Sequence, residues 1–289
     1  MIWANALIQG ILLGGLYALF ACGLSLLYGV MGVINLAHGD MAVVAAYATI
    51  IIAPLLGVPP ILVVALVVPG FFVAGYLGQR TLIQASLDRG PLTTLIVSFG
   101  LSVIIQNVLL EVSSADSHSI DIGSIVAQSI TINSQISIPW LSLAIFLLAI
   151  AVLAGLAWFL GHTTTGRLIR AVADDREAAQ LAGTRYRHVF GIAAGFAAAT
   201  VALAGVAFGM YSSFDPSAGP VRLLFAFEAV VIGGIGSLWG TLAGGIVLGV
   251  AQALGAALDP SLGILTGNLV FLAVLAVRPQ GIAGGLVRA

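Results

Sequence analysis

A series of long apolar runs constrains this chain more than any other feature of its sequence. The runs cover residues 4–30, 41–56, 61–79, 92–110, 139–160, 189–211, 223–257 and 264–277. About 20 apolar residues carry a helix across a bilayer, and in lipid a helix pairs all of its own backbone polar groups. Only 7% of the residues are charged, against about 25% in soluble domains. The sequence therefore predicts an all-α, polytopic integral membrane bundle formed by a single domain, residues 1–289.

Glycines divide the run 223–257. Gly233, Gly234, Gly236 and Gly240 interrupt it, and the part before them would form a helix of only about 21 Å. The hydrocarbon core of a bilayer is about 30 Å thick. We therefore expect a broken or half-length helix here, and eight or nine transmembrane helices in all.

Small residues recur within several runs at a spacing of four. Gly10, Gly14, Ala18 and Cys22 form one such stripe. Small residues let helix backbones approach closely in lipid. The predicted helix-packing glycines are Gly10, Gly14, Gly195, Gly236, Gly240 and Gly244.

The segment 161–188 is the longest charged stretch and contains five of the ten arginines. Within it we expect one short helix, with Asp174 as N-cap, Glu177 three residues later as in a capping box, and Gly183 as the stop. Two helical turns are not stable alone. One face of this helix carries Ala178, Leu181 and Ala182, and it either docks into a groove of another protein or lies on the membrane surface as a connector.

The distribution of arginine predicts the orientation of the chain. If 161–188 is cytoplasmic, strict alternation also places Arg80, Arg89, Arg278 and Arg288 in the cytoplasm. The polar segment 111–138 contains no arginine and then faces outward, as the positive-inside rule requires. The N-terminus is then external and the C-terminus cytoplasmic. Within the outer segment, alternating apolar and polar residues suggest a small pair of strands.

The residue types exclude several kinds of chemistry. The chain has no lysine, so it has no Walker A motif and no lysine Schiff base, and any ATP must be hydrolysed by another chain. Cys22 is the single cysteine, which excludes an intrachain disulfide. A net charge of −1 gives no indication of the basic surface that nucleic-acid binding requires. There is no HExxH motif or catalytic triad pattern, so we expect no enzyme activity, no metal site and no cofactor.

Four of the polar residues in or beside the apolar runs each allow two interpretations. For Asn35, His38 and Asp40, one interpretation is that they cap the second helix, and the other is that they line a translocation path near an inner gate. Glu228 lies within 223–236, where an ionised carboxylate is costly. It either bonds to backbone freed at the glycine break or lines the path. We expect Gln106, Asn107 and Glu111 to be packing and surface groups.

Several motifs resemble those of a known family. Glu177-Ala178-Ala179 followed by Gly183 is similar to the EAA signature of ABC-importer permeases, although the usual Leu-Pro after it is absent. The stretches 14–40, 166–183 and 233–249 resemble the LivH-type permease of branched-chain amino-acid importers. This resemblance implies that an ATPase contacts the coupling residues Asp174, Arg176, Glu177, Ala178, Ala179, Leu181, Ala182 and Gly183.

The same resemblance implies a set of partners and a location. The partners would be a second, LivM-type permease or a second copy of this chain, two cytoplasmic ATPase subunits, and a periplasmic or extracellular solute-binding protein. The location would be the bacterial inner membrane. Branched-chain amino acids are the implied solutes, with urea, short amides or another small polar solute as alternatives. A secondary transporter or channel is the alternative from another functional class.

Overall fold

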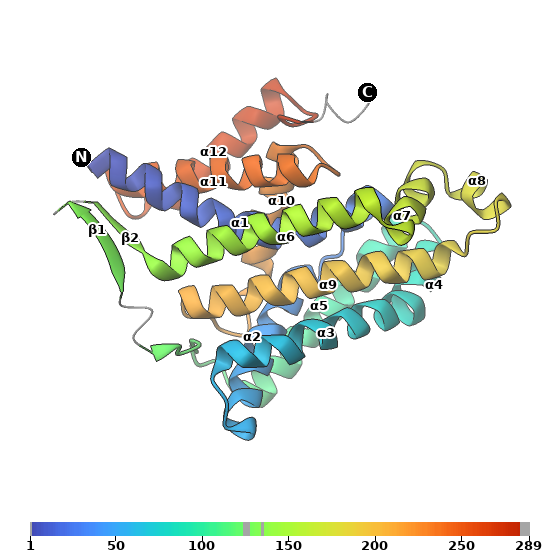
Figure 1. The fold of residues 1–289 in the computed structure, drawn as a ribbon, viewed down its shortest axis with the longest axis horizontal. Helices are drawn as coiled ribbons and strands as arrows, with labels where there is room; N and C mark the ends of the chain where they lie inside the picture. Colours follow the sequence, from blue (N-terminus) through green and yellow to red (C-terminus); the bar gives the residue numbers. More distant parts are fainter. Residues whose placement is uncertain (1, 124–127, 134–135, 284–289) are drawn as a thin grey trace.

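The computed structural model describes residues 2–123, 128–133 and 136–283, and it is a bundle of long helices lying side by side (Figure 1). Within these residues, seven helical segments are long and apolar enough to cross a membrane. They are α1 (Ile2–Met31), α2 (His38–Leu56), α3 (Pro60–Gly78) with its extension to Leu87, α5 (Pro91–Ser113), α6 (Trp140–His162), α9 (Tyr186–Tyr211) and α11 (Leu238–Leu258). Two shorter helices, α10 (Gly219–Gly233) and α12 (Leu262–Val277), complete the bundle. The predicted polytopic helical bundle is confirmed.

Among the described helices, α1 and α11 form the most extensive contact. Gly10 and Gly14 of α1 lie directly against the backbone of α11, where an added Cβ would be 2.6 Å from Val250 Cα and 2.5 Å from Ile246 Cα. Gly245 and Gly249 of α11 lie equally close to α1. Both helices can approach this closely only because glycine has no side chain. Gly195, Gly240 and Gly244 also meet neighbouring backbone, as the sequence predicted.

The glycine break between α10 and α11 is confirmed. The helix α10 has 15 residues and ends at Gly233, and its C-cap Gly234 has a φ of +100°. Gly236 serves the turn rather than helix packing, because its φ is +82° and an added Cβ would meet only Gly29, at 3.6 Å. The chain after α12 returns to this break, where Ile282 N donates to Ile232 O at 2.8 Å and Ala283 N donates to Gly233 O at 3.0 Å. These bonds pair carbonyls that the end of α10 leaves free.

The third helix extends further than the sequence indicated. We expected it to end at Gln79 and to be followed by a polar loop containing Arg80, but it continues through the π-helical turn η1 (Gln79–Ile83) and α4 (Gln84–Leu87). No helix-breaking residue occurs between Gln79 and Leu87, and the Thr81 hydroxyl bonds back to Leu77 O at 2.8 Å. The polar turn is therefore confined to residues 88–90.

The two ends of the bundle differ. The N-terminus lies at one end with the antiparallel strands β1 (Ser129–Asn133) and β2 (Ile136–Pro139), which confirm the expected strand pair (Figure 1). The helices α4, α7 (Thr164–Asp174) and α8 (Arg176–Leu181) lie at the opposite end, and α8 extends furthest from the bundle (Figure 1).

The charged segment 161–188 contains two helices instead of the single one expected. Thr163 caps α7 by accepting from Gly166 N at 3.0 Å, and Ile169 and Val172 bury the apolar face of α7. Asp174 is consequently the last residue of α7, so its prediction as an N-cap is wrong. Asp175 caps α8 instead, with Oδ1 accepting from Ala178 N at 2.9 Å.

Candidate functional site

The first candidate site is the outer face of α8. Leu181 is 91% exposed, and Ala178 and Ala182 are exposed beside it. Gly183 ends the helix with a φ of +88°, and the bonds from Thr184 N to Ala179 O and from Gly183 N to Gln180 O, both 3.0 Å, form a Schellman motif. The helix thus presents one large and two small apolar side chains away from its own chain.

The inner face of α8 packs on the rest of the protein. Ala179 is buried in a cluster that includes Val172, Tyr186 and Phe190. Of the eight predicted coupling residues, Ala179 therefore supports α8 from within the chain. Glu177, by contrast, is exposed.

Asp88 connects α8 to the bundle. Its Oδ1 lies 3.1 Å from Arg176 Nη2, and its Oδ2 lies 3.1 Å from Arg187 Nη2. The Arg176 guanidinium also lies 4.0 Å from the centre of the Tyr186 ring, within the range of a cation–π contact. Arg176 thus contacts its own chain. The sequence did not indicate Asp88, because 88 residues separate it from Arg176 and neither forms a recognisable motif with the other.

The residues Asn35, His38 and Asp40 do not form one cluster. The helix α2 begins at His38, with Ala37 as its N-cap and Asn35 Oδ1 accepting from Ala37 N at 3.0 Å. His38 is buried, and its Nε2 lies 3.2 Å from Phe20 O, which can only accept, so Nε2 carries the proton. Asp40 is fully buried and accepts from Gln106 Nε2 at 3.1 Å. Gln106 is therefore a specific partner of Asp40, a role that its sequence context did not reveal.

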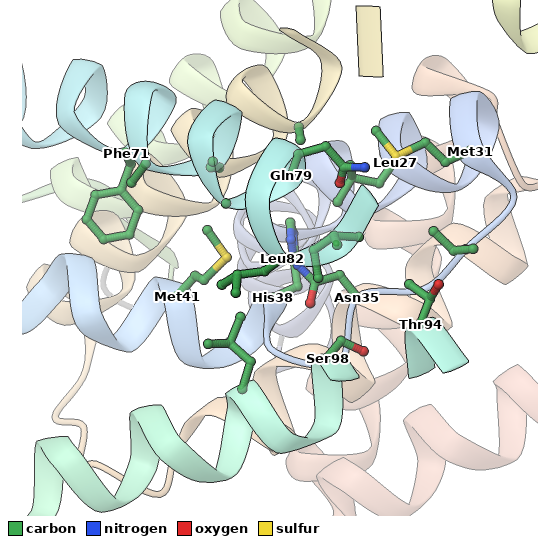
Figure 2. Close-up of a pocket in the computed structure, with 18 of the residues that line it drawn as sticks. Leu27, Met31, Asn35, His38, Met41, Phe71, Gln79, Leu82, Thr94 and Ser98 are labelled. Carbon is green, nitrogen blue, oxygen red and sulfur yellow. The ribbon is translucent and has the colours of Figure 1, made fainter. Parts of the chain in front are cut away.

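Asn35 and His38 line a cavity of about 410 Å³, the second candidate site. It lies among the end of α1, the start of α2, α3 with η1, α5 and α9. Figure 2 shows side chains from several of these elements converging on it. The polar residues that line it are Asn35, His38, Gln79, Thr94 and Ser98, and most of the remaining lining is apolar. Asp40 and Glu228, the other two residues for which the sequence suggested a position along a path, do not line this cavity.

Glu228 lies elsewhere, in a contact between α10 and α12. It is 2% exposed, and with the Asn268 amide oriented to donate, the Asn268 nitrogen lies 3.0 Å from Glu228 Oε1 and 3.2 Å from Ile264 O. One of the two interpretations of Glu228 was that it bonds to backbone freed at the glycine break. That interpretation is wrong, because the C-terminal segment 278–283 bonds to the backbone at the break while Glu228 faces α12.

Comparison with known proteins identifies the family. A family model described as the permease component of branched-chain amino acid transport systems matches residues 6–277. The chain belongs to this family of transport permeases. Its relatives in the family include the BraD permease of the Pseudomonas aeruginosa high-affinity branched-chain amino acid transport system, 32% identical over 98% of this chain and 96% of BraD. The LivH permease of Salmonella typhimurium is 33% identical over 96% of this chain and 94% of LivH.

A solved structure shares the fold of this family member. PsaBC from Streptococcus pneumoniae, solved in complex with Fab, matches 96% of this chain and 92% of its own chain with a TM-score of 0.51 and 14% identity. At this identity the likeness concerns the fold alone. The chain is thus a multi-pass membrane protein of a transport permease family.

Proposed function

We propose that this chain is a permease subunit of an ABC importer for branched-chain amino acids. The family match across residues 6–277 carries the proposal, and the names of BraD and LivH support the choice of solute. The chain contains no lysine and hence no Walker A motif, so ATP hydrolysis would belong to partner subunits.

The proposal includes specific partners and an orientation. A second permease of LivM type, or a second copy of this chain, would complete the membrane domain, with two ATPases inside and a solute-binding protein outside the bacterial inner membrane. The positive-inside rule supports a cytoplasmic position for the end that carries α7 and α8. With Cys22 replaced by Ala, a cysteine at Thr164 should escape a membrane-impermeant thiol reagent in intact cells, and labelling there would reverse the orientation.

The outer face of α8 would be the ATPase docking surface. Burying a leucine side chain contributes about 1.5–3 kcal/mol, so the 91% exposed Leu181 gives a partner a large gain on binding. Its position on the helix that extends furthest from the bundle supports contact with a protein rather than with lipid (Figure 1). The neighbouring Ala178 and Ala182 are small enough to let a groove approach the helix closely.

Leu181→Asp tests the docking surface. The substitution removes the apolar contact and places an unpaired charge in the groove. Recovery of the ATPase with the tagged permease should fall at least about tenfold, which corresponds to about 1.4 kcal/mol. The permease itself should still insert and accumulate, because Leu181 makes little contact with its own chain.

Leu258→Asp is the matched control. Leu258 is 67% exposed at the far end of α11, near the N-terminus of the chain. This variant should retain the ATPase as the wild type does. If Leu181→Asp retains the ATPase equally well, α8 is not the docking surface.

A further inference from the structure

The cavity among α1, α2, α3 and α5 has the size and composition of a small-molecule site. Its volume of about 410 Å³ falls within the roughly 300–1,000 Å³ typical of ligand pockets. Leu27, Met31, Phe71, Leu82 and Ile105 contribute to an apolar wall. Ligand sites of this kind combine such a wall with a few polar groups that orient the ligand.

Gln79 supplies a polar group that no other described residue satisfies. Its side chain lines the cavity and the residue is only 4% exposed. Within the described part of the chain, its Nε2 is buried without a hydrogen-bond partner. A buried amide donor left unpaired costs about 1–3 kcal/mol. An acceptor inside the cavity would remove this cost.

The other polar side chains of the lining differ from Gln79 in this respect. Ser98 Oγ donates to Leu95 O at 3.0 Å and accepts from Leu36 N at 3.2 Å. Thr94 Oγ1 donates to Gly90 O at 3.3 Å, and His38 Nε2 bonds to Phe20 O. Among the described lining residues, Gln79 is thus the one with a buried side-chain donor that has no hydrogen-bond partner.

Two backbone features mark the same place. Gln79 is the first residue of the π-helical turn η1, and π turns are rare and concentrated at functional sites. The N-terminus of α2 also lines the cavity at His38. The start of a helix favours negative charge nearby, because its first N–H groups point toward it.

We propose that this cavity is a binding site for the transported solute within a single permease chain. A branched-chain amino acid would place its aliphatic side chain against the apolar wall and its carboxylate against Gln79 Nε2 and the start of α2. The inference rests on the proposed function for the class of solute. A lipid acyl chain fits the apolar wall less completely, because it offers no acceptor to Gln79.

The chain provides a matched pair of glycines for the test. Gly78 and Gly70 both lie in α3, and a Cβ added to either would meet nothing within 4 Å. Gly78 lines the cavity, whereas Gly70 is exposed and lies outside the lining. Gly78→Leu therefore fills the cavity, while Gly70→Leu makes the same change on the same helix without filling it.

Uptake should be measured with the assembled importer, for leucine and for alanine, in cells that carry each variant. Gly78→Leu should lower leucine uptake by about tenfold or more, since one methylene in a pocket changes discrimination by roughly 10–200-fold. Gly70→Leu should stay within about twofold of the wild type, because it adds no group to the pocket. The smaller Gly78→Ala should lower leucine uptake more than alanine uptake, a shift in preference that a folding defect would not produce.

Gln79→Leu separates binding from stability. The variant removes an unpaired buried amide, so its melting temperature in detergent should be unchanged or higher. Its leucine uptake should nevertheless fall, because the solute loses its hydrogen-bond donor.

The site is wrong if Gly78→Leu and Gln79→Leu import leucine as well as Gly70→Leu does. It is also wrong if Gly78→Ala lowers leucine and alanine uptake equally. A separate result would contradict the proposed function: the unmodified importer would take up none of leucine, isoleucine and valine. A branched-chain amino acid could then not be the ligand of this cavity.

Discussion

The contact between α1 and α11 and the positions of Gly70 and Gly78 in α3 use glycine in opposite ways. At Gly10 and Gly14 an added Cβ would collide with the backbone of α11, whereas at Gly70 and Gly78 of α3 it would meet open space. The helix α1 is mostly buried and α3 is mostly exposed. The α1–α11 side of the molecule is thus held by direct contact between helix backbones. The α3 side has a cavity large enough for a ligand. It also has an exposed apolar surface that lipid or a second subunit must cover.

Gly14→Leu should disrupt the contact between α1 and α11 and have the largest effect on the protein. The new side chain has to displace the backbone at Ile246, and overpacking a close-packed site costs about 1–3 kcal/mol or more. We expect the amount of inserted permease and its melting temperature in detergent to fall sharply. Gly70→Leu should leave both near the wild-type values, and equal behaviour of the two variants would contradict the distinction between the two sides.

Substitutions at Glu228 test whether its contact with α12 is structural. Glu228→Gln keeps an acceptor for Asn268, so stability and uptake should remain close to the wild type. Glu228→Leu leaves the Asn268 amide short of a partner and should destabilise the protein by about 1–3 kcal/mol. The double variant with Asn268→Leu should recover most of this loss, because both polar partners are then absent.

The Glu228 variants can also contradict a purely structural role for this residue. If Glu228→Gln folds normally and binds its ATPases but transports poorly, the charge belongs to the transport mechanism. Glu228 would then be more than a packing contact between α10 and α12.

Asp88→Asn should have the smallest effect of these substitutions. It weakens the ion pairs with Arg176 and Arg187, and exposed pairs of this kind contribute about 0.2–1 kcal/mol each. Global stability should change little, while ATPase binding should fall a few-fold because α8 is held less firmly. Asp116→Asn, at an exposed acid in the arginine-free segment, is the control and should bind the ATPase normally. Unchanged ATPase binding in Asp88→Asn would show that Asp88 does not position α8.

Local patterns in the sequence were sufficient to predict most helices, the glycine break and the strand pair. Apolar runs and glycine spacing act over a few turns, so they can be recognised without knowing the fold. The predicted N-cap Asp174 was wrong by one residue, because α7 buries Ile169 and Val172 and continues through that position.

The contacts between residues far apart in the sequence could not be predicted in this way. Asp88 meets Arg176, Gln106 meets Asp40 and Asn268 meets Glu228 only after distant helices have packed. Gln79 had the appearance of a residue at the end of a membrane span. Its importance depends on the continuation of the helix into η1 and on the cavity beside it, and neither has a signature in the sequence.

Reconstitution of the importer in proteoliposomes tests the central claim most directly. The permease pair, the ATPases and the solute-binding protein should together take up radiolabelled leucine when ATP is present on the ATPase side, and uptake should stop without ATP. Leu181→Asp in the permease should abolish this uptake, and Leu258→Asp should not. ATP-independent leucine uptake by the permease alone, driven by an ion gradient, would contradict the account and identify a secondary transporter instead.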